Sequence, residues 1–341
     1  MTQNNNNISL RAEIINNMDL SPDIKKLLVS IVDGHALVPL TTDVMAKRIF
    51  SPDLHPERFD FLMQRIMKDD TLVTKSPASN ETLLDNMESK RLIFDMSSWI
   101  TDGRYANLEF QSVAQEFIFN RADIHSSRML MMLYSADCRK KDTVNYKNVK
   151  SAVVVILMKN SPKAFKEFNS TRYIHRIKTA TSDTGMEFPL LRQIAFVQLD
   201  KALEQFLNKT YNQDEDLELL AILAIIADIN NRSVYDATSN SPFIKNIYED
   251  AEIFSQDREV QRMTFESELN TVFYDMEMQG AEQRGVQEGI KRGIDFTNDL
   301  YSWLYSNNRD DDVKKASFDS DYREKLFEEY RSKHSDNNIE A

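Results

Sequence analysis

The chain has 341 residues, of which 41% are hydrophobic and 10% aromatic, as expected for a globular protein that buries a full core. The net charge is −12, and a single cysteine, Cys138, excludes an internal disulfide and a cysteine-based zinc site. No apolar run approaches the roughly 18 residues of a membrane span, and the N-terminus lacks the pattern of a signal peptide, so we expect a cytoplasmic protein without membrane association.

The N-terminal part of the chain is predicted to be helical. Apolar residues recur at helical spacing over 22–33, 43–50 and 59–67, and Ser21 is placed to cap the first of these helices. Residues 71–74 are predicted to form a short strand.

The stretch from Arg91 to Gln111 is predicted to be two strands joined by a tight turn. A three-residue hairpin loop needs a left-handed residue in its last position, and Gly103 holds that position after Thr101 and Asp102. This loop length places Asp95 opposite Glu109. A two-residue loop would instead mix polar and apolar side chains on both faces, so the pattern favours the three-residue loop.

The two faces of this hairpin differ in chemistry. Asp95, Glu109 and Gln111 share the polar face, whereas the other face is apolar and is expected to pack on the core. Two carboxylates about 5 Å apart at Cβ repel each other unless a cation joins them. Oxygen ligands of this kind suit Mg²⁺ or Mn²⁺. The alternative is an acidic pair on the solvated face of an edge hairpin.

The order of elements after the hairpin predicts an α+β fold with a mixed sheet. A long helix follows over 114–133, and His125 lies one turn beyond Arg121, where it faces either the hairpin or solvent. Residues 149–158 are largely β-branched and read as a buried central strand. Two further strands, 172–179 and 190–199, are predicted to be joined by a turn.

The charges are unevenly distributed along the chain. Residues 1–199 carry 26 Lys and Arg against 23 Asp and Glu, whereas residues 200–341 carry 16 against 31. Residues 121–178 hold 13 basic and 4 acidic residues. This block is either a solvated basic face or, beside a metal site, a surface for a phosphate backbone.

The rest of the chain, from Lys201 on, is predicted to be helical. Gly285, Gly289 and Gly293 lie on one helical stripe, where a second helix could approach closely, so the stripe is a candidate for self-association into a homo-oligomer. We divide the chain into an N-terminal helical extension (1–36), a core (37–205), a helical region (206–296) and an acidic tail (297–341).

Several short stretches together resemble one family, the PD-(D/E)XK nuclease family transposases, a group of recombination-promoting nucleases found widely in bacteria. They are Asp43-Val-Met-Ala-Lys47-Arg-Ile-Phe50, Phe94-Asp95-Met96, Asp102-Gly103, Leu108-Glu109-Phe110-Gln111, Phe119-x-Arg121, Phe196-Val-Gln-Leu-Asp-Lys201 and Gly285-Val-Gln-Glu-Gly289-Ile290. The resemblance runs from about Leu40 to Ile294. The chain departs from the family pattern at Ala46, usually Phe, and at Gln198, usually Glu.

The resemblance implies a restriction-endonuclease-like core with a central mixed sheet flanked by helices. By the same resemblance, Asp95 and Glu109 are metal ligands, Gln111 takes the place of the signature lysine, and Asp43 is an auxiliary acid. Gln111 carries no charge and can only orient a water or a phosphate oxygen. The residues expected to contact DNA are Arg121, Arg128, Arg139, Lys140, Lys141 and Lys147.

The function expected from these features is Mg²⁺- or Mn²⁺-dependent hydrolysis of DNA phosphodiesters with little sequence specificity, in transposition, recombination or defence against mobile DNA. Phosphate contacts position a duplex without reading its sequence, which is the reason for expecting low specificity. The alternative is a non-catalytic scaffold that assembles with partners through its helical C-terminal half.

Overall fold

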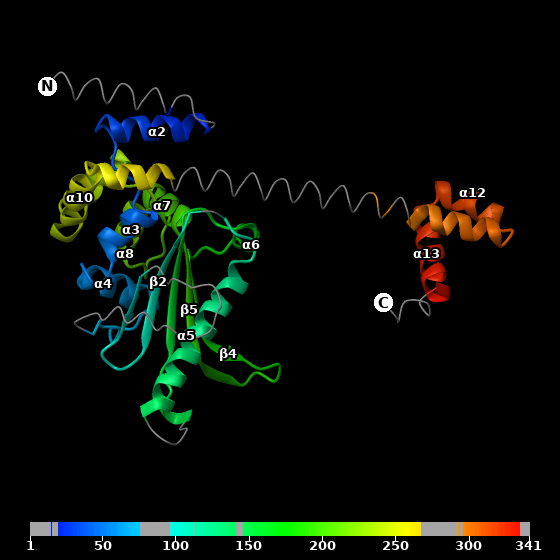
Figure 1. The fold of residues 1–341 in the computed structure, drawn as a ribbon, viewed down its shortest axis with the longest axis horizontal. Helices are drawn as coiled ribbons and strands as arrows, with labels where there is room; N and C mark the ends of the chain where they lie inside the picture. The colour runs from blue at the N-terminus through cyan, green and yellow to red at the C-terminus, as the bar shows by residue number, and fades with distance from the viewer. Residues whose placement is uncertain are drawn as a thin grey trace. The chain divides into compact units, whose positions relative to one another are not determined.

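The computed structural model describes residues 15, 20–75, 96–112, 114–140, 146–266, 291, 293 and 296–334. The chain separates into two compact units, Met1–Thr271 and Val272–Ala341 (Figure 1). No helix in these described ranges is long and apolar enough to cross a membrane.

The first unit contains a five-stranded sheet and helices on both of its faces (Figure 1). Its elements in chain order are α2 (Pro22–Val32), α3 (Asp43–Phe50), α4 (Pro56–Met67), β1 (Met96–Trp99), β2 (Tyr105–Gln111), α5 (Ile118–Lys140), the 3₁₀ turn η1 (Tyr146–Asn148), β3 (Ala152–Met158), α6 (Lys163–Phe168), β4 (Ile174–Thr181), β5 (Glu187–Gln198), α7 (Leu199–Asn208), α8 (Leu217–Ala227), α9 (Arg232–Thr238) and α10 (Pro242–Ser255).

The strands lie in the order β1-β2-β3-β5-β4. Strands β2, β3 and β5 run parallel, while β1 and β4 pair antiparallel at the two edges. The central strand β3 is buried along its whole length, as its run of β-branched residues predicts. The predicted α+β class with a mixed sheet flanked by helices is therefore confirmed.

Each face of the sheet packs against its own set of helices. Alternate residues of β2, such as Leu108 and Phe110, join the larger core formed with α3, α4, α8 and α10. The opposite face of the sheet, which includes Ile156 and Phe196, packs against α5 and α6 in a second core. Because side chains alternate along a strand, Glu109 and Gln111 lie on the face that α5 covers.

Local signals set the helix starts as the sequence predicts. Ser21 caps α2 by accepting a hydrogen bond from the Ile24 amide at 3.4 Å, and α3 begins at Asp43 after an extended Thr42. The prediction of a strand at 71–74 is wrong, because only Thr74 forms a single bridge, with Ile100. Residues 69–72 form a turn instead, in which the Leu72 amide donates to the Asp69 carbonyl at 3.2 Å and the Thr71 amide donates to the Asp69 carboxylate at 3.1 Å.

The helices that follow the sheet belong to the same hydrophobic core. Residues of α8 and α10, including Leu223 and Ile247, are buried together with residues of α3 and α4.

The second unit contains α12 (Asp310–Phe318) and α13 (Ser320–His334), which share a small core around Leu300 and Leu304. The positions Gly285 and Gly289 of the proposed self-association stripe lie outside the described residues.

Candidate functional site

The hairpin of β1 and β2 has the predicted three-residue loop. Met96 faces Leu108 and Trp99 faces Tyr105 in an antiparallel ladder, and Gly103 has a φ of +89°. The Ile100 amide donates to the Arg104 carbonyl at 2.9 Å and closes the loop. Continued by one pair, this register would place position 95 opposite Glu109. Asp95 itself lies outside the described residues.

Glu109 is a buried acid at the centre of the structure. It is only 2% exposed, because β2 lies between β1 and β3 and α5 covers this face of the sheet. Glu109 therefore does not sit on the solvated face of an edge hairpin. A carboxylate at such a depth must be neutralised or paired with positive groups.

Three donors meet one oxygen of Glu109. Gln111 Nε2 donates to Oε1 at 2.5 Å, Arg121 Nε donates to the same atom at 2.8 Å, and Arg121 Nη2 also contacts it. The second oxygen, Oε2, lies 3.4 Å from Nδ1 of His125, within the range of an ion pair, and accepts no hydrogen bond from the described residues. The Glu109 carboxylate is thus held by one neighbour on its own strand and two on α5.

These contacts keep Glu109 ionised. Burial by itself raises the pKa of this carboxyl, but His125 and the positive charge of Arg121 outweigh it and hold the pKa below its ordinary value. Arg121 and His125 can both reach Glu109 because they lie four residues apart on one face of α5. The result is a negative charge fixed at the sheet surface beneath a helix.

Sequence reasoning left the orientation of His125 open and overlooked Asn107. His125 is 7% exposed and faces the site rather than solvent. Asn107 is buried two residues before Glu109 on the same face of β2, and its side-chain amide finds no hydrogen-bond partner among the described residues. Asn107, Glu109 and Gln111 are spaced two residues apart on one predicted strand, and this spacing could have identified Asn107 as a residue of the same face. Asn107 thus leaves hydrogen-bonding capacity beside Glu109.

The proposed auxiliary acid, Asp43, lies at the start of α3. That start adjoins the end of β2, because the Ser112 hydroxyl donates to the Thr41 carbonyl at 3.2 Å. The Asp43 side chain is exposed and pairs with Lys47, with 2.8 Å between Nζ and Oδ1. Asp43 is therefore near the carboxyl end of β2, but in this structure its carboxylate is directed to its own helix.

The carboxyl ends of β3 and β5 carry a buried polar network next to this edge. The Ser161 hydroxyl donates to Asp200 at 2.5 Å and accepts from Gln198 Nε2 at 2.9 Å, while Gln198 Oε1 lies 3.0 Å from His175 Nε2. Gln198 is the position where the family usually has Glu. Here its amide serves both as donor and as acceptor, which a carboxylate could not do.

The basic residues between 121 and 178 do not form one surface. Arg121 and the exposed Arg128 lie on α5, whereas Arg176 reaches the α4 face of the sheet, where its Nε donates to the Ile66 carbonyl. Lys178 likewise bonds to the Met67 carbonyl at 3.1 Å. Among the remaining predicted DNA contacts, the side chains of Arg139 and Lys140 and all of Lys141 lie outside the described residues, and Lys147 belongs to η1.

The side chains around Glu109 offer the kind of oxygen atoms that a hard cation such as Mg²⁺ binds. Glu109 is ionised, nearly inaccessible to solvent and already in contact with a guanidinium, and carboxylate and amide oxygens are the ligands that Mg²⁺ and Mn²⁺ prefer. Within the described part of the chain, no group of three His, Cys, Asp or Glu residues is arranged to hold a metal ion. Asp95, the second predicted ligand, falls outside that part.

Comparison with known proteins supports the resemblance read from the sequence. The family model described as PD-(D/E)XK nuclease family transposase matches residues 40–288, well over half of the chain. No curated protein and no solved structure matches.

Proposed function

Because the chain belongs to the PD-(D/E)XK nuclease family transposases, we propose that it is a metal-dependent endonuclease that hydrolyses DNA phosphodiester bonds with low sequence specificity. The observation that carries this proposal is the buried carboxylate of Glu109, whose pKa is lowered, on a strand whose register, continued by one pair beyond Met96, would place position 95 opposite it. Two acids in that relation repel each other, and a divalent cation between them removes the repulsion.

Asp95 and Glu109 are the residues that would hold Mg²⁺ or Mn²⁺. When bound, such an ion supplies polarisation of the phosphate and activation of a water molecule. Gln111, which donates to Glu109, fixes the orientation of that carboxylate and can accept a hydrogen bond from a water through its amide oxygen. Gln111 cannot act as a base, so proton removal from the water does not depend on it.

Arg121 is proposed to serve both Glu109 and the DNA backbone. Its side chain is 35% exposed, so the guanidinium that neutralises Glu109 also reaches solvent. A DNA phosphate offers the same planar group two acceptor oxygens. Arg121 would therefore turn to the phosphate when DNA binds, leaving the Glu109 oxygens to a cation. Arg128, two turns further along α5, would contact the backbone on the same side.

The test is plasmid nicking by purified protein in Mg²⁺ or Mn²⁺. We expect nicking by the wild type and at least a hundredfold loss in Asp95→Ala and Glu109→Gln. Glu167→Gln on α6 is the matched control, because Glu167 is exposed and pairs only with Lys163 at 3.7 Å. Undiminished cutting by Asp95→Ala would show that the site is wrong.

The same proteins separate the enzyme from a non-catalytic scaffold. Calorimetric titration of the wild type with Mg²⁺, with and without a short DNA duplex, should give binding that Asp95→Ala weakens. A chain that binds neither Mg²⁺ nor DNA would fit the scaffold instead, with its helical C-terminal half as the interacting part.

A further inference from the structure

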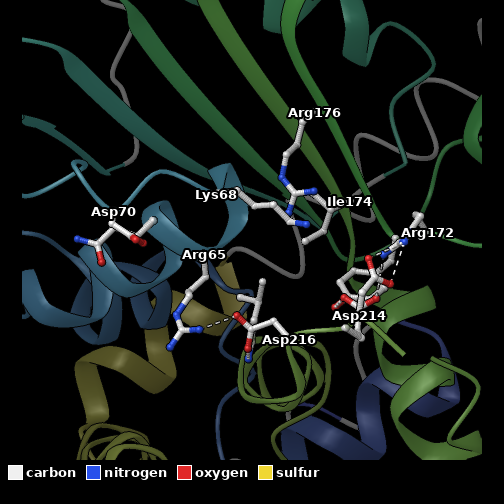
Figure 2. A pocket seen from close by; sticks show the side chains of 12 residues that line it. Arg65, Lys68, Asp70, Arg172, Ile174, Arg176, Asp214 and Asp216 are labelled. Atoms are coloured by element: carbon white, nitrogen blue, oxygen red, sulfur yellow. Dashed lines mark hydrogen bonds and ion pairs between the residues drawn. The ribbon is translucent and has the colours of Figure 1, made fainter. Parts of the chain in front are cut away.

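A cavity of about 320 Å³ lies on the α4 side of the first unit, apart from Glu109 (Figure 2). Its walls come from the last turn of α4, the first residues of β4 and the segment that leads into α8. Ile174 and Leu219 form an apolar part of the wall. The rest is unusually rich in charge: Arg65, Lys68, Arg172 and Arg176 face a group of acidic residues.

Most of these acids already have a basic or hydroxyl partner. Arg65 binds Asp216 at 2.9 Å, and Arg172 binds Asp214 at 3.0 Å. The half-buried Glu215 accepts a hydrogen bond from the Tyr173 hydroxyl at 2.6 Å, and one of its oxygens lies 3.6 Å from Arg172. Arg65 and Arg172 are therefore engaged by the acidic side of the cavity, where Asp214, Glu215 and Asp216 outnumber them.

Two cations of the lining, Lys68 and Arg176, donate to no carboxylate among the described residues. Arg176 uses Nε on the Ile66 carbonyl, but its two terminal nitrogens form no hydrogen bond or ion pair with the described residues, and the same is true of the Lys68 ammonium. Figure 2 shows the two side chains approaching each other, Arg176 from β4 and Lys68 from the end of α4. Both positive groups thus line the same cavity.

Two carboxylates near these groups, Glu215 beside Arg176 and Asp214 beside Lys68, offset the repulsion between the two cations without hydrogen-bonding to either. Partial burial, however, removes hydration from the guanidinium. Burial lowers the pKa of Arg176, and the neighbouring Tyr173 and Glu215 compensate only in part. An oxyanion would restore the lost hydrogen bonds, since a guanidinium and an ammonium together offer several donors to one tetrahedral group.

We propose that this cavity binds the phosphate group of a small phosphorylated molecule through Lys68 and Arg176, a function separate from DNA cleavage. A doubly charged phosphate matches two cations that line one cavity. The cavity is larger than a phosphate alone, and the apolar wall of Ile174 and Leu219 leaves room for the attached group. Binding would tie α4, β4 and the start of α8 together.

The test is calorimetric titration of the full chain with inorganic phosphate and with adenosine monophosphate, followed in parallel by thermal unfolding. We expect saturable binding with stabilisation on heating, and tighter binding of the monophosphate. Lys68→Gln should weaken it about tenfold or more, the effect of losing one charge-assisted hydrogen bond. Lys163→Gln, on exposed α6, is the matched control and should bind as the wild type does.

Absence of saturable binding in the wild type, or equal binding by Lys68→Gln, would overturn the proposal. A short duplex without terminal phosphates serves as the competitor. Displacement of bound phosphate by this duplex in the wild type would show that the cations serve a DNA backbone instead. Asp95→Ala should bind phosphate normally, so a failure of the nuclease proposal leaves this result unaffected.

Discussion

Replacing Arg121 by glutamine should destabilise the protein and at the same time increase its affinity for Mg²⁺. Arg121 supplies two of the three contacts to Oε1 of Glu109. The substitution removes the positive charge and leaves a side chain that is too short to repeat both contacts. Glu109 would then remain ionised and buried, and Gln111 and His125 would be the contacts of its carboxylate left among those described above.

The size of the effect follows from the exposure of the two groups. Breaking a fully buried ion pair costs about 3–5 kcal/mol, and a hydrogen bond to a charged group contributes about 1.5–3 kcal/mol. Glu109 is 2% exposed but Arg121 is 35% exposed, so water can partly replace the guanidinium. We therefore expect Arg121→Gln to lower the free energy of unfolding by about 2 kcal/mol in metal-free buffer.

The assay is urea unfolding with and without Mg²⁺, together with calorimetric titration of the metal. Added Mg²⁺ should recover more stability in Arg121→Gln than in the wild type, because the cation no longer competes with the guanidinium. Arg128→Gln is the matched control on the same helix, with an exposed side chain. The reasoning is refuted if both variants lose equal stability, or if Arg121→Gln binds Mg²⁺ no more tightly than the wild type.

Two further predictions concern the hairpin loop. Burial raises the pKa of Asp69, but hydrogen bonds from Arg104 and Thr71 prevail and lower it to about 2. The ionised Asp69 therefore contributes about 2 kcal/mol to the free energy of unfolding at neutral pH, and this stabilisation should be lost as the pH falls from about 4 toward 2. The stability difference between the wild type and Asp69→Asn should therefore narrow in acid unfolding, and a constant difference would contradict this assignment. Gly103→Ala should lower the free energy of unfolding by about 1–2 kcal/mol, because φ at this position is +89°. The added methyl group itself has room, since its nearest neighbour is the Lys150 side chain at 3.6 Å. Unchanged urea unfolding would show that the loop adopts another conformation.

Local sequence signals were sufficient for much of the fold. Glycine at the last position of a three-residue loop fixed the register of β1 on β2, since only a left-handed residue closes such a loop. The β-branched run of β3 placed that strand at the centre of the sheet. The prediction for 71–74 failed because Asp69 accepts hydrogen bonds from the Thr71 and Leu72 amides and holds this segment in a turn.

The family and the polar face of the hairpin could be determined from the sequence alone, because strand alternation places Glu109 and Gln111 together whatever else the chain does. What packs over that face was decided only by tertiary structure. The alternation of side chains along a strand predicts which residues lie on the same face of the sheet. It does not predict that α5 brings Arg121 and His125 into contact with Glu109. Nor could a count of charges show that the basic block is divided between α5 and the α4 side of the sheet, since residues of one stretch of sequence lie on opposite faces of the sheet.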